Sequence, residues 1–324
     1  MKKCDKKEII RENGDCVEAQ LPIIVSASRS TDIPAFYSDW FFHRLRLGYS
    51  AWDNPFNGVR YYVSYDDCRF IVFWSKNPDP LIVHLDELRE RGIGCYVQYT
   101  LNDYEREGLE RGVPSLEKRV DTFKRLVDKL GFGSVVWRFD PLILVENRIG
   151  VPELLEKVGR VGDMLKGYTE RLVFSYADIG VYKRVAGNLL ANGVRYVEWD
   201  EDSELQFAYS LSELNKKWGY ELMTCGEKVS LEQYGIRHGK CIDDGLIRRI
   251  SPEDEVLKSF LDGGCSKDSG QRKFCGCIKS KDIGEYNTCP HLCEYCYANS
   301  SKEVAVGNWR RHESEPFGET ITGK

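Results

Sequence analysis

Short apolar runs alternate with longer amphipathic stretches between about residues 21 and 225, and this alternation constrains the fold more than any other feature. The apolar runs are nearly continuous, as in strands that are buried on both faces. Strands separated by helices of about 10 to 17 residues predict βα units and a parallel sheet. About seven such units favour a TIM-like (β/α) barrel, incomplete or distorted, over an open doubly wound sheet.

The expected elements divide the chain into four parts. The expected strands are Ile23–Ser28, Tyr49–Trp52, Phe70–Trp74, Gly94–Leu101, Ser134–Phe139, Leu172–Tyr176 and Tyr220–Thr224. The expected helices are Asp32–Gly48, Pro80–Arg91, Ser115–Leu130, Val151–Leu165, Val181–Ala191 and Glu204–Trp218. The parts are an N-terminal extension (1–20), the barrel (21–227), a cysteine-rich segment packed on the barrel mouth (228–300) and a polar tail (301–324).

The composition narrows the class of protein. With 42% hydrophobic residues in 324, the chain has enough apolar side chains for a sizeable core. Its 46 Lys and Arg against 51 Asp and Glu give a net charge of −5, which disfavours a general nucleic-acid partner but leaves room for a local basic patch. No apolar run approaches the length of a membrane helix, and the charged N-terminus does not resemble a signal peptide. We therefore expect a cytoplasmic protein.

Polar residues follow the expected strands, and in a barrel such residues converge on one face. Arg and Lys suit the anchoring of carboxylates or phosphates, while Asp can orient them or move protons. The candidate catalytic residues are Arg29, Asp32, Lys76, Asn77, Arg138 and Asp140. The candidate cofactor-binding residues are Ser28, Thr100, Ser175 and Glu227. The alternative is that these strand ends are polar only because they border loops, with each Arg–Asp pair neutralising itself.

The cysteines are the strongest chemical signal. Of 12 cysteines, six lie between Cys265 and Cys296, and such a cluster in a reducing compartment indicates metal binding rather than disulfides. The segment 289–296 has CxxxCxxC spacing, which suits an iron–sulfur cluster and leaves one iron without a protein ligand. Zinc is the alternative metal. The zinc candidates are Cys275, Cys277, Cys289 and Cys293, with His291 as a further ligand.

A count of the clustered thiols suggests two sites. Cys225 and Cys241 flank the start of the cysteine-rich segment, and with five later cysteines they make seven, or four plus three. A fully ligated cluster would use Cys225, Cys241, Cys275 and Cys277. An open cluster would use Cys289, Cys293 and Cys296, with Cys265 as a spare.

Two resemblances bear on function. The segment Cys289–Asn299 resembles the cluster loop of radical S-adenosylmethionine enzymes, in the subgroup near spore photoproduct lyase. The chain from about 21 to 300 resembles the DUF1848 family, through Ser26–Ala35, Val72–Pro78, Val136–Pro141, Gln271–Cys277 and Ser280–Tyr286. The first resemblance implies [4Fe–4S] clusters, S-adenosylmethionine bound at the open iron, a small-molecule substrate, and an electron donor such as ferredoxin or flavodoxin.

The chain departs from the radical enzymes in two ways. Their cluster loop follows the first strand, whereas here it lies near the C-terminus. Their Gly-Gly-Glu stretch after the second strand is not evident, since Tyr49–Trp52 is followed by Asp53 and Asn54. Three functions stay open: a radical S-adenosylmethionine-like oxidoreductase or lyase, an iron–sulfur electron-transfer protein or reductase without that chemistry, and a non-redox hydrolase or repair enzyme with structural zinc.

Overall fold

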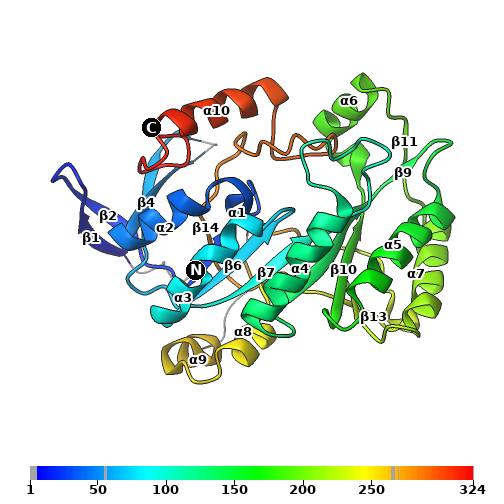
Figure 1. Cartoon of the computed structure of the whole chain (residues 1–324), viewed down its shortest axis with the longest axis horizontal. Helices are drawn as coiled ribbons and strands as arrows, with labels where there is room; N and C mark the ends of the chain where they lie inside the picture. Colours follow the sequence, from blue (N-terminus) through cyan, green and yellow to red (C-terminus); the bar gives the residue numbers. More distant parts are fainter. Residues whose placement is uncertain (1–5, 55–56, 264–266, 269, 324) are drawn as a thin grey trace.

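The computed structural model describes residues 6–54, 57–263, 267–268 and 270–323, and it has a mixed α/β fold (Figure 1). Its main sheet contains eight strands, all parallel, in the order β13-β12-β10-β8-β7-β6-β3-β14. These strands are β3 (Ile24–Ala27), β6 (Phe70–Ser75), β7 (Gly94–Thr100), β8 (Val135–Leu142), β10 (Arg171–Tyr176), β12 (Glu221–Thr224), β13 (Ile236–His238) and β14 (Lys281–Asp282). The expected α/β class and parallel sheet are confirmed.

Helices flank this sheet and follow the expected strand–helix alternation (Figure 1). They are α1 (Ile33–Phe36), α2 (Ser38–Leu47), η1 (Asp79–His84), α3 (Leu85–Glu90), α4 (Leu116–Leu130), α5 (Val151–Leu165), η2 (Ile179–Val181), α6 (Lys183–Ala191), α7 (Glu201–Asn215), η3 (Glu232–Tyr234), α8 (Asp244–Ile250), α9 (Glu255–Asp262) and α10 (Lys302–Ser314). Within the described ranges, no helix combines the length and the apolar character that crossing a membrane requires.

The two faces of the main sheet differ in what covers them. On β7, Val97 and Tyr99 face a large core built with the outer helices, and Tyr99 stacks on Phe123 of α4 at 5.5 Å. Tyr96, one position away in the pleat, faces the opposite core, which includes residues of α8 and α9 together with Cys241 and Cys277. We call this second side the thiol face of the sheet. The alternation along each strand thus directs one set of side chains toward the cysteine-rich segment.

The strand expected at Tyr49–Trp52 is present, but its expected place in the main sheet is wrong. It forms β4 (Tyr49–Asp53) in a separate sheet of order β1-β2-β5-β4, with β1 (Lys6–Ile10), β2 (Cys16–Gln20) and β5 (Arg60–Ser64). The reason is that β4 pairs antiparallel with β5, the next strand along the chain. A further pair of short strands, β9 (Leu144–Val145) and β11 (Tyr196–Val197), is also antiparallel.

The edge strands of the main sheet, β13 and β14, were not expected from the sequence. They are only three and two residues long, too short to show a periodic pattern. In the part of the chain that the structure describes, the strand order ends at β13 and β14 and does not pair them with each other. Closure into a barrel is therefore not confirmed.

The segment after Ser300, expected as a polar tail, is packed against the molecule. It forms α10, and the following Thr320, Ile321 and Thr322 are buried. The Ala51 N–H donates to Glu319 O at 2.8 Å, and Thr322 Oγ1 donates to Glu285 Oε2 at 3.2 Å. The last residues of the chain thus join the N-terminal sheet to the cysteine-rich segment.

Gly284→Ala is expected to destabilise the protein, because a Cβ at this position would lie 1.8 Å from Ser28 Oγ, beside the β14–β3 pair. Over-packing such a contact costs about 1–3 kcal/mol. Thermal unfolding followed by circular dichroism measures the effect. Gly307→Ala in α10 is the matched control, since nothing lies within 4 Å of a Cβ there. Equal loss of stability in the two variants would contradict the position of β14.

Candidate functional site

The cysteine-rich segment is attached to the main sheet through Asp282 at the end of β14. This carboxylate accepts hydrogen bonds from Ser26 Oγ at 2.8 Å, Ser28 Oγ at 2.7 Å and the Arg29 N–H at 2.9 Å. Ser28, a candidate from the sequence, therefore positions β14 against β3. Arg29 also lies near Asp282, with Nη1 at 3.9 Å from Oδ2.

Four cysteines form a first group, the four-thiol group, on the thiol face: Cys225, Cys241, Cys275 and Cys277. Cys225 directly follows β12, and its Sγ lies 3.2 Å from Cys241 Sγ. Tyr96 Oη and Gln98 Nε2 of β7 donate hydrogen bonds to the Cys241 carbonyl oxygen at 2.7 and 2.9 Å. Cys277 Sγ accepts the N–H groups of Cys241 and Ile242 at 3.2 and 3.3 Å.

Guanidinium groups surround the four-thiol group. Arg138 Nη1 donates to Cys241 Sγ at 3.0 Å, and Arg138 also pairs with Asp140. Hydrogen bonds from Cys241 and Cys275 lower the pKa of Cys277, and the charge of Arg29 adds to the effect. The hydrogen bond with Cys241 lowers the pKa of Cys225, and Arg138 contributes in the same direction. The hydrogen bonds with Cys225 and Cys277 raise the pKa of Cys241, and the hydrogen bond with Cys277 raises the pKa of Cys275. Thiolate character is therefore favoured at Cys225 and Cys277, beside Arg138 and Arg29.

The remaining three cysteines, Cys289, Cys293 and Cys296, form a second group, the three-thiol loop, which follows β14. Charge interactions connect the three thiols to one another. The loop is held by His291, whose Nδ1 donates to Gly112 O at 2.9 Å and whose Nε2 lies 2.9 Å from Asp32 Oδ2.

Asp32 fixes the position of this loop relative to the strand ends. The buried carboxylate caps α1 through the Ala35 N–H at 3.0 Å. It also accepts Ser75 Oγ at 2.6 Å and the Lys76 N–H at 2.7 Å. Together with His291, these contacts connect α1, the end of β6 and the three-thiol loop. Asp32 therefore acts in the structure as a positioning residue.

A buried ionic network lies beside the three-thiol loop. Lys76 Nζ donates to Glu110 Oε1 at 2.7 Å and to Tyr295 Oη at 2.9 Å, and Tyr295 also bonds to Glu110. Arg119 Nη1 lies 3.6 Å from Glu110 Oε2. Burial opposes ionisation of Glu110, but Lys76 and Arg119 outweigh it and lower its pKa to about 2. Two cations against one carboxylate leave a positive charge next to Cys293.

Asn102 joins the two thiol groups. Its Nδ2 donates to Tyr295 Oη at 3.0 Å and to Asp140 O at 3.2 Å, while its Oδ1 accepts the Asp140 N–H at 2.8 Å. Asp140 in turn bonds to Ser175 and Arg138. The strand ends of β7, β8 and β10 thereby form one continuous hydrogen-bonded surface.

The other sequence candidates lie nearby with smaller roles. The Asn77 N–H donates to Ser75 Oγ at 2.9 Å. Thr100 ends β7 opposite Arg138 in the sheet register. Glu227 accepts the Tyr176 N–H at 3.0 Å, and burial raises its pKa to about 8. Cys265, the spare ligand candidate, lies outside the described residues.

Sequence reasoning missed several residues of this site. Asn102 directly follows the strand that was expected at Gly94–Leu101. The rule that polar residues after strands form the site, which identified Arg138, therefore applies to Asn102 as well. Asp282 ends a strand too short to recognise. Glu110 and Tyr295 lie in loops that give no local signal. His291 was expected only as a zinc ligand, whereas its ring contacts Gly112 and Asp32.

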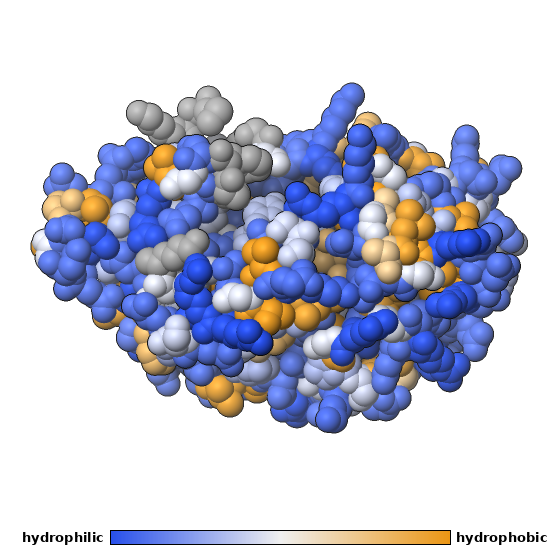
Figure 2. Space-filling view, turned by 90° about the horizontal axis from the view of Figure 1, so that it is seen from above, coloured by the Kyte–Doolittle hydropathy of each residue, from blue (hydrophilic) through white to orange (hydrophobic). Residues whose placement is uncertain are grey.

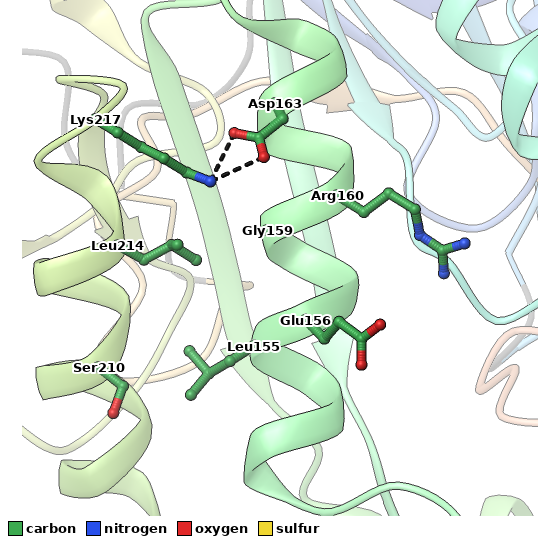
Figure 3. A pocket seen from close by; sticks show the side chains of 8 residues that line it. All are labelled: Leu155, Glu156, Gly159, Arg160, Asp163, Ser210, Leu214 and Lys217. Atoms are coloured by element: carbon green, nitrogen blue, oxygen red, sulfur yellow. Dashed lines mark hydrogen bonds and ion pairs between the residues drawn. The ribbon is translucent and has the colours of Figure 1, made fainter.

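Within residues 6–54, 57–263, 267–268 and 270–323, no three or more His, Cys, Asp or Glu side chains are arranged so that they could hold a metal ion. A cavity of about 580 Å³ lies between α5 and α7, where Lys217 pairs with Asp163 (Figure 3). This cavity is on the outer helices and contains none of the candidate residues.

The strand order and the four-thiol group define a parallel α/β protein in which four cysteines gather on one side of the main sheet. A family model described as a domain of unknown function, DUF1848, matches residues 24–298. The chain belongs to this family, which confirms the assignment expected from the sequence. No curated protein and no solved structure matches the chain.

Glu110→Gln is expected to destabilise the protein by about 3–5 kcal/mol at pH 7, because it leaves Lys76 and Arg119 buried without their carboxylate. Chemical unfolding measures the loss, with the exposed Glu117→Gln as control. The pKa of Glu110 lies at about 2, below its ordinary 4.5. Its stabilising effect is therefore complete above pH 4.5 and falls as the pH drops toward 2. The difference between wild type and variant should shrink over that range, and a constant difference would contradict the ionic network.

Proposed function

We propose that this protein is an iron–sulfur enzyme similar to the radical S-adenosylmethionine group. In this proposal the four-thiol group holds one [4Fe–4S] cluster and the three-thiol loop holds a second, open cluster. The observation that carries the proposal is the convergence of Cys225, Cys241 and Cys277 beside Arg138 on the thiol face. We also infer that the main sheet curves into an incomplete barrel, since its strands are all parallel and follow one another in nearly sequential order.

The four-thiol group fits such a cluster in donor chemistry and in charge. Thiolates are the ligands of iron–sulfur clusters, and their negative charge needs compensation when it is buried. Arg138 already donates to Cys241, and Arg29 Nη2 is a buried N–H group without a hydrogen-bond partner among the described residues. Since Arg29 is attracted by Cys277 and Cys241, its free donor suits a sulfur-rich anion at this position.

The three-thiol loop fits an open cluster. Burial raises the pKa of Cys293, while Lys76 opposes that shift. A positive charge beside the loop favours the thiolate form that metal binding needs. Three protein ligands leave one iron free for S-adenosylmethionine.

The sheet order supports the resemblance despite the late position of the loop in the chain. β14 pairs with β3 and forms an edge of the main sheet. In space, the three-thiol loop therefore follows an edge strand whose neighbour begins the series of βα units. The loop thus lies beside the end of the first strand of the series, where Tyr297 contacts Arg29, and this supports the position that the resemblance implies.

The chain's own residues would position and shield the reactants. When bound, the cofactors supply one-electron chemistry that cleaves S-adenosylmethionine reductively, with electrons from a donor such as ferredoxin or flavodoxin. Lys76, Glu110 and Tyr295 form a buried, mutually bonded layer beside the three-thiol loop that excludes water. Asn102 connects this layer to Asp140, whose carboxylate is held ready by Arg138 and Ser175 to orient a substrate.

Structural zinc in the four-thiol group is the second candidate, because four convergent thiols also suit a tetrahedral zinc site. In that case the protein would be a non-redox enzyme, such as a hydrolase, with a metal that fastens the cysteine-rich segment.

Metal content of anaerobically purified protein separates the candidates. Two clusters predict about eight irons per chain in wild type and about four in Cys241→Ala and in Cys293→Ala. Cys95→Ala is the matched control, because this thiol is buried in β7 and burial raises its pKa to about 12. Full iron in the Cys95 variant is expected. Zinc without iron in wild type would contradict the proposal and support the structural site.

Electron paramagnetic resonance of the dithionite-reduced protein tests S-adenosylmethionine binding. The cluster signal should change on adding S-adenosylmethionine in wild type and in Cys241→Ala, because the open cluster is intact in both. The change should vanish in Cys293→Ala. An iron-loaded wild type whose signal does not respond would indicate an electron-transfer protein or reductase instead.

A further inference from the structure

Three half-exposed tyrosines lie near the end of β3 and the three-thiol loop. Tyr182 is 39% exposed, Tyr286 42% and Tyr297 50%. The rings of Tyr182 and Tyr297 are 6.2 Å apart, and Tyr286 is close enough to both for an electrostatic effect on the pKa of the phenols. Tyr297 Oη donates to Arg29 O at 2.7 Å, so its ring stands at the end of β3. We call these three residues the tyrosine collar.

The collar is assembled by tertiary structure. Tyr182 ends η2, Tyr286 follows β14 and Tyr297 directly follows Cys296. Three separate segments thus bring aromatic rings to one surface. The face of the molecule seen from above is mainly hydrophilic, with a band of exposed hydrophobic residues near its middle (Figure 2). Partly exposed aromatic rings of this kind offer flat apolar faces on which another planar group can stack.

Arg272 supplies a positive charge beside the collar. Its guanidinium lies against Gly226, about 3.8 Å from the position that a Cβ would have on this glycine. It also interacts electrostatically with Tyr182. No hydrogen bond or ion pair of this guanidinium occurs within the described residues, although two carboxylates are near. Asp140 is engaged by Arg138, and Glu227 accepts a backbone N–H. Arg272 is therefore available to an outside anion.

We propose that the tyrosine collar and Arg272 form the substrate entrance, and that the substrate joins a planar aromatic ring to a carboxylate or phosphate. The ring stacks on Tyr182 and Tyr297, and the anion meets the planar guanidinium. A small molecule fits better than a nucleic-acid polymer, because residues 225–300 carry 11 Lys and Arg against 12 Asp and Glu. That the bound molecule is a substrate rests on the proposed function. The binding of a ring-bearing anion at this surface does not depend on it.

Isothermal titration of the full chain, purified anaerobically, tests the binding. Adenosine 5′-monophosphate and indole-3-acetate represent the phosphate and carboxylate sources of the anion. Adenosine lacks the anion, and ribose 5-phosphate and acetate lack the ring. At least one of the two complete probes should bind more than tenfold tighter than its fragments. Fragments that bind as well as both complete probes overturn the proposal.

Variants locate the site. Arg272→Gln should weaken binding of the complete probe about tenfold to hundredfold, and Tyr182→Leu about twofold to tenfold. Lys273→Gln, at the neighbouring exposed position, and Tyr209→Leu, at an exposed tyrosine of α7, are matched controls that should bind normally. Equal weakening by Arg272→Gln and Lys273→Gln would show nonspecific charge attraction and overturn the proposal.

Two further titrations distinguish this proposal from the hypothesis that the protein binds iron–sulfur clusters. Binding that depends on Arg272 in protein without iron supports the collar even where the cluster hypothesis fails. Titration of the complete probe with saturating S-adenosylmethionine present distinguishes substrate from cofactor. Undiminished binding supports a substrate entrance, whereas complete displacement assigns the collar to S-adenosylmethionine and overturns the assignment.

Discussion

The short parallel pairing of β14 with β3 is the contact on which the rest of the site depends. Only two residue pairs make it, Lys281 with Val25 and Asp282 with Ser26. Asp282 strengthens it because its carboxylate collects three donors from the residues that end β3. This contact orients the chain on both sides. The four-thiol group lies before β14 against the thiol face, and the three-thiol loop lies after it at the strand ends.

The distribution of charge around the thiols explains how so many polar groups are buried together. Arg29 and Arg138 both lie over the ring of Trp74, with Cζ at 5.3 and 5.4 Å from the ring centroid, so one indole contacts two guanidinium groups beside the four-thiol group. Lys76 and Arg119 surround Glu110 near the three-thiol loop. Each of these cations also lies close to a carboxylate: Arg29 to Asp282, Arg138 to Asp140, and Lys76 and Arg119 to Glu110. A positive charge beside a thiol favours its thiolate form.

The sequence was most informative where charged residues lie on one buried apolar strand. Arg138 and Asp140 stand on a buried apolar strand, and two charged residues there require partners, so their importance was visible without the structure. The same logic failed for Tyr49–Trp52, because an apolar run does not reveal which sheet it joins. It could not find Glu110, whose role comes from cations contributed by other elements. The partition of the thiols came from counting. The structure brings Cys225, Cys241 and Cys277 into contact, but the identity of any metal remains a prediction.

The distance in sequence between β3 and β14 has a consequence for synthesis of the protein. A chain emerging from the ribosome completes β3 early, but the strand that pairs with its free edge is made about 250 residues later, at about 5–20 residues per second. Until then, the thiol face lacks the segment that carries Cys277 and the three-thiol loop. Both thiol groups can therefore form only after the segment that carries Cys277, β14 and the three-thiol loop has been made.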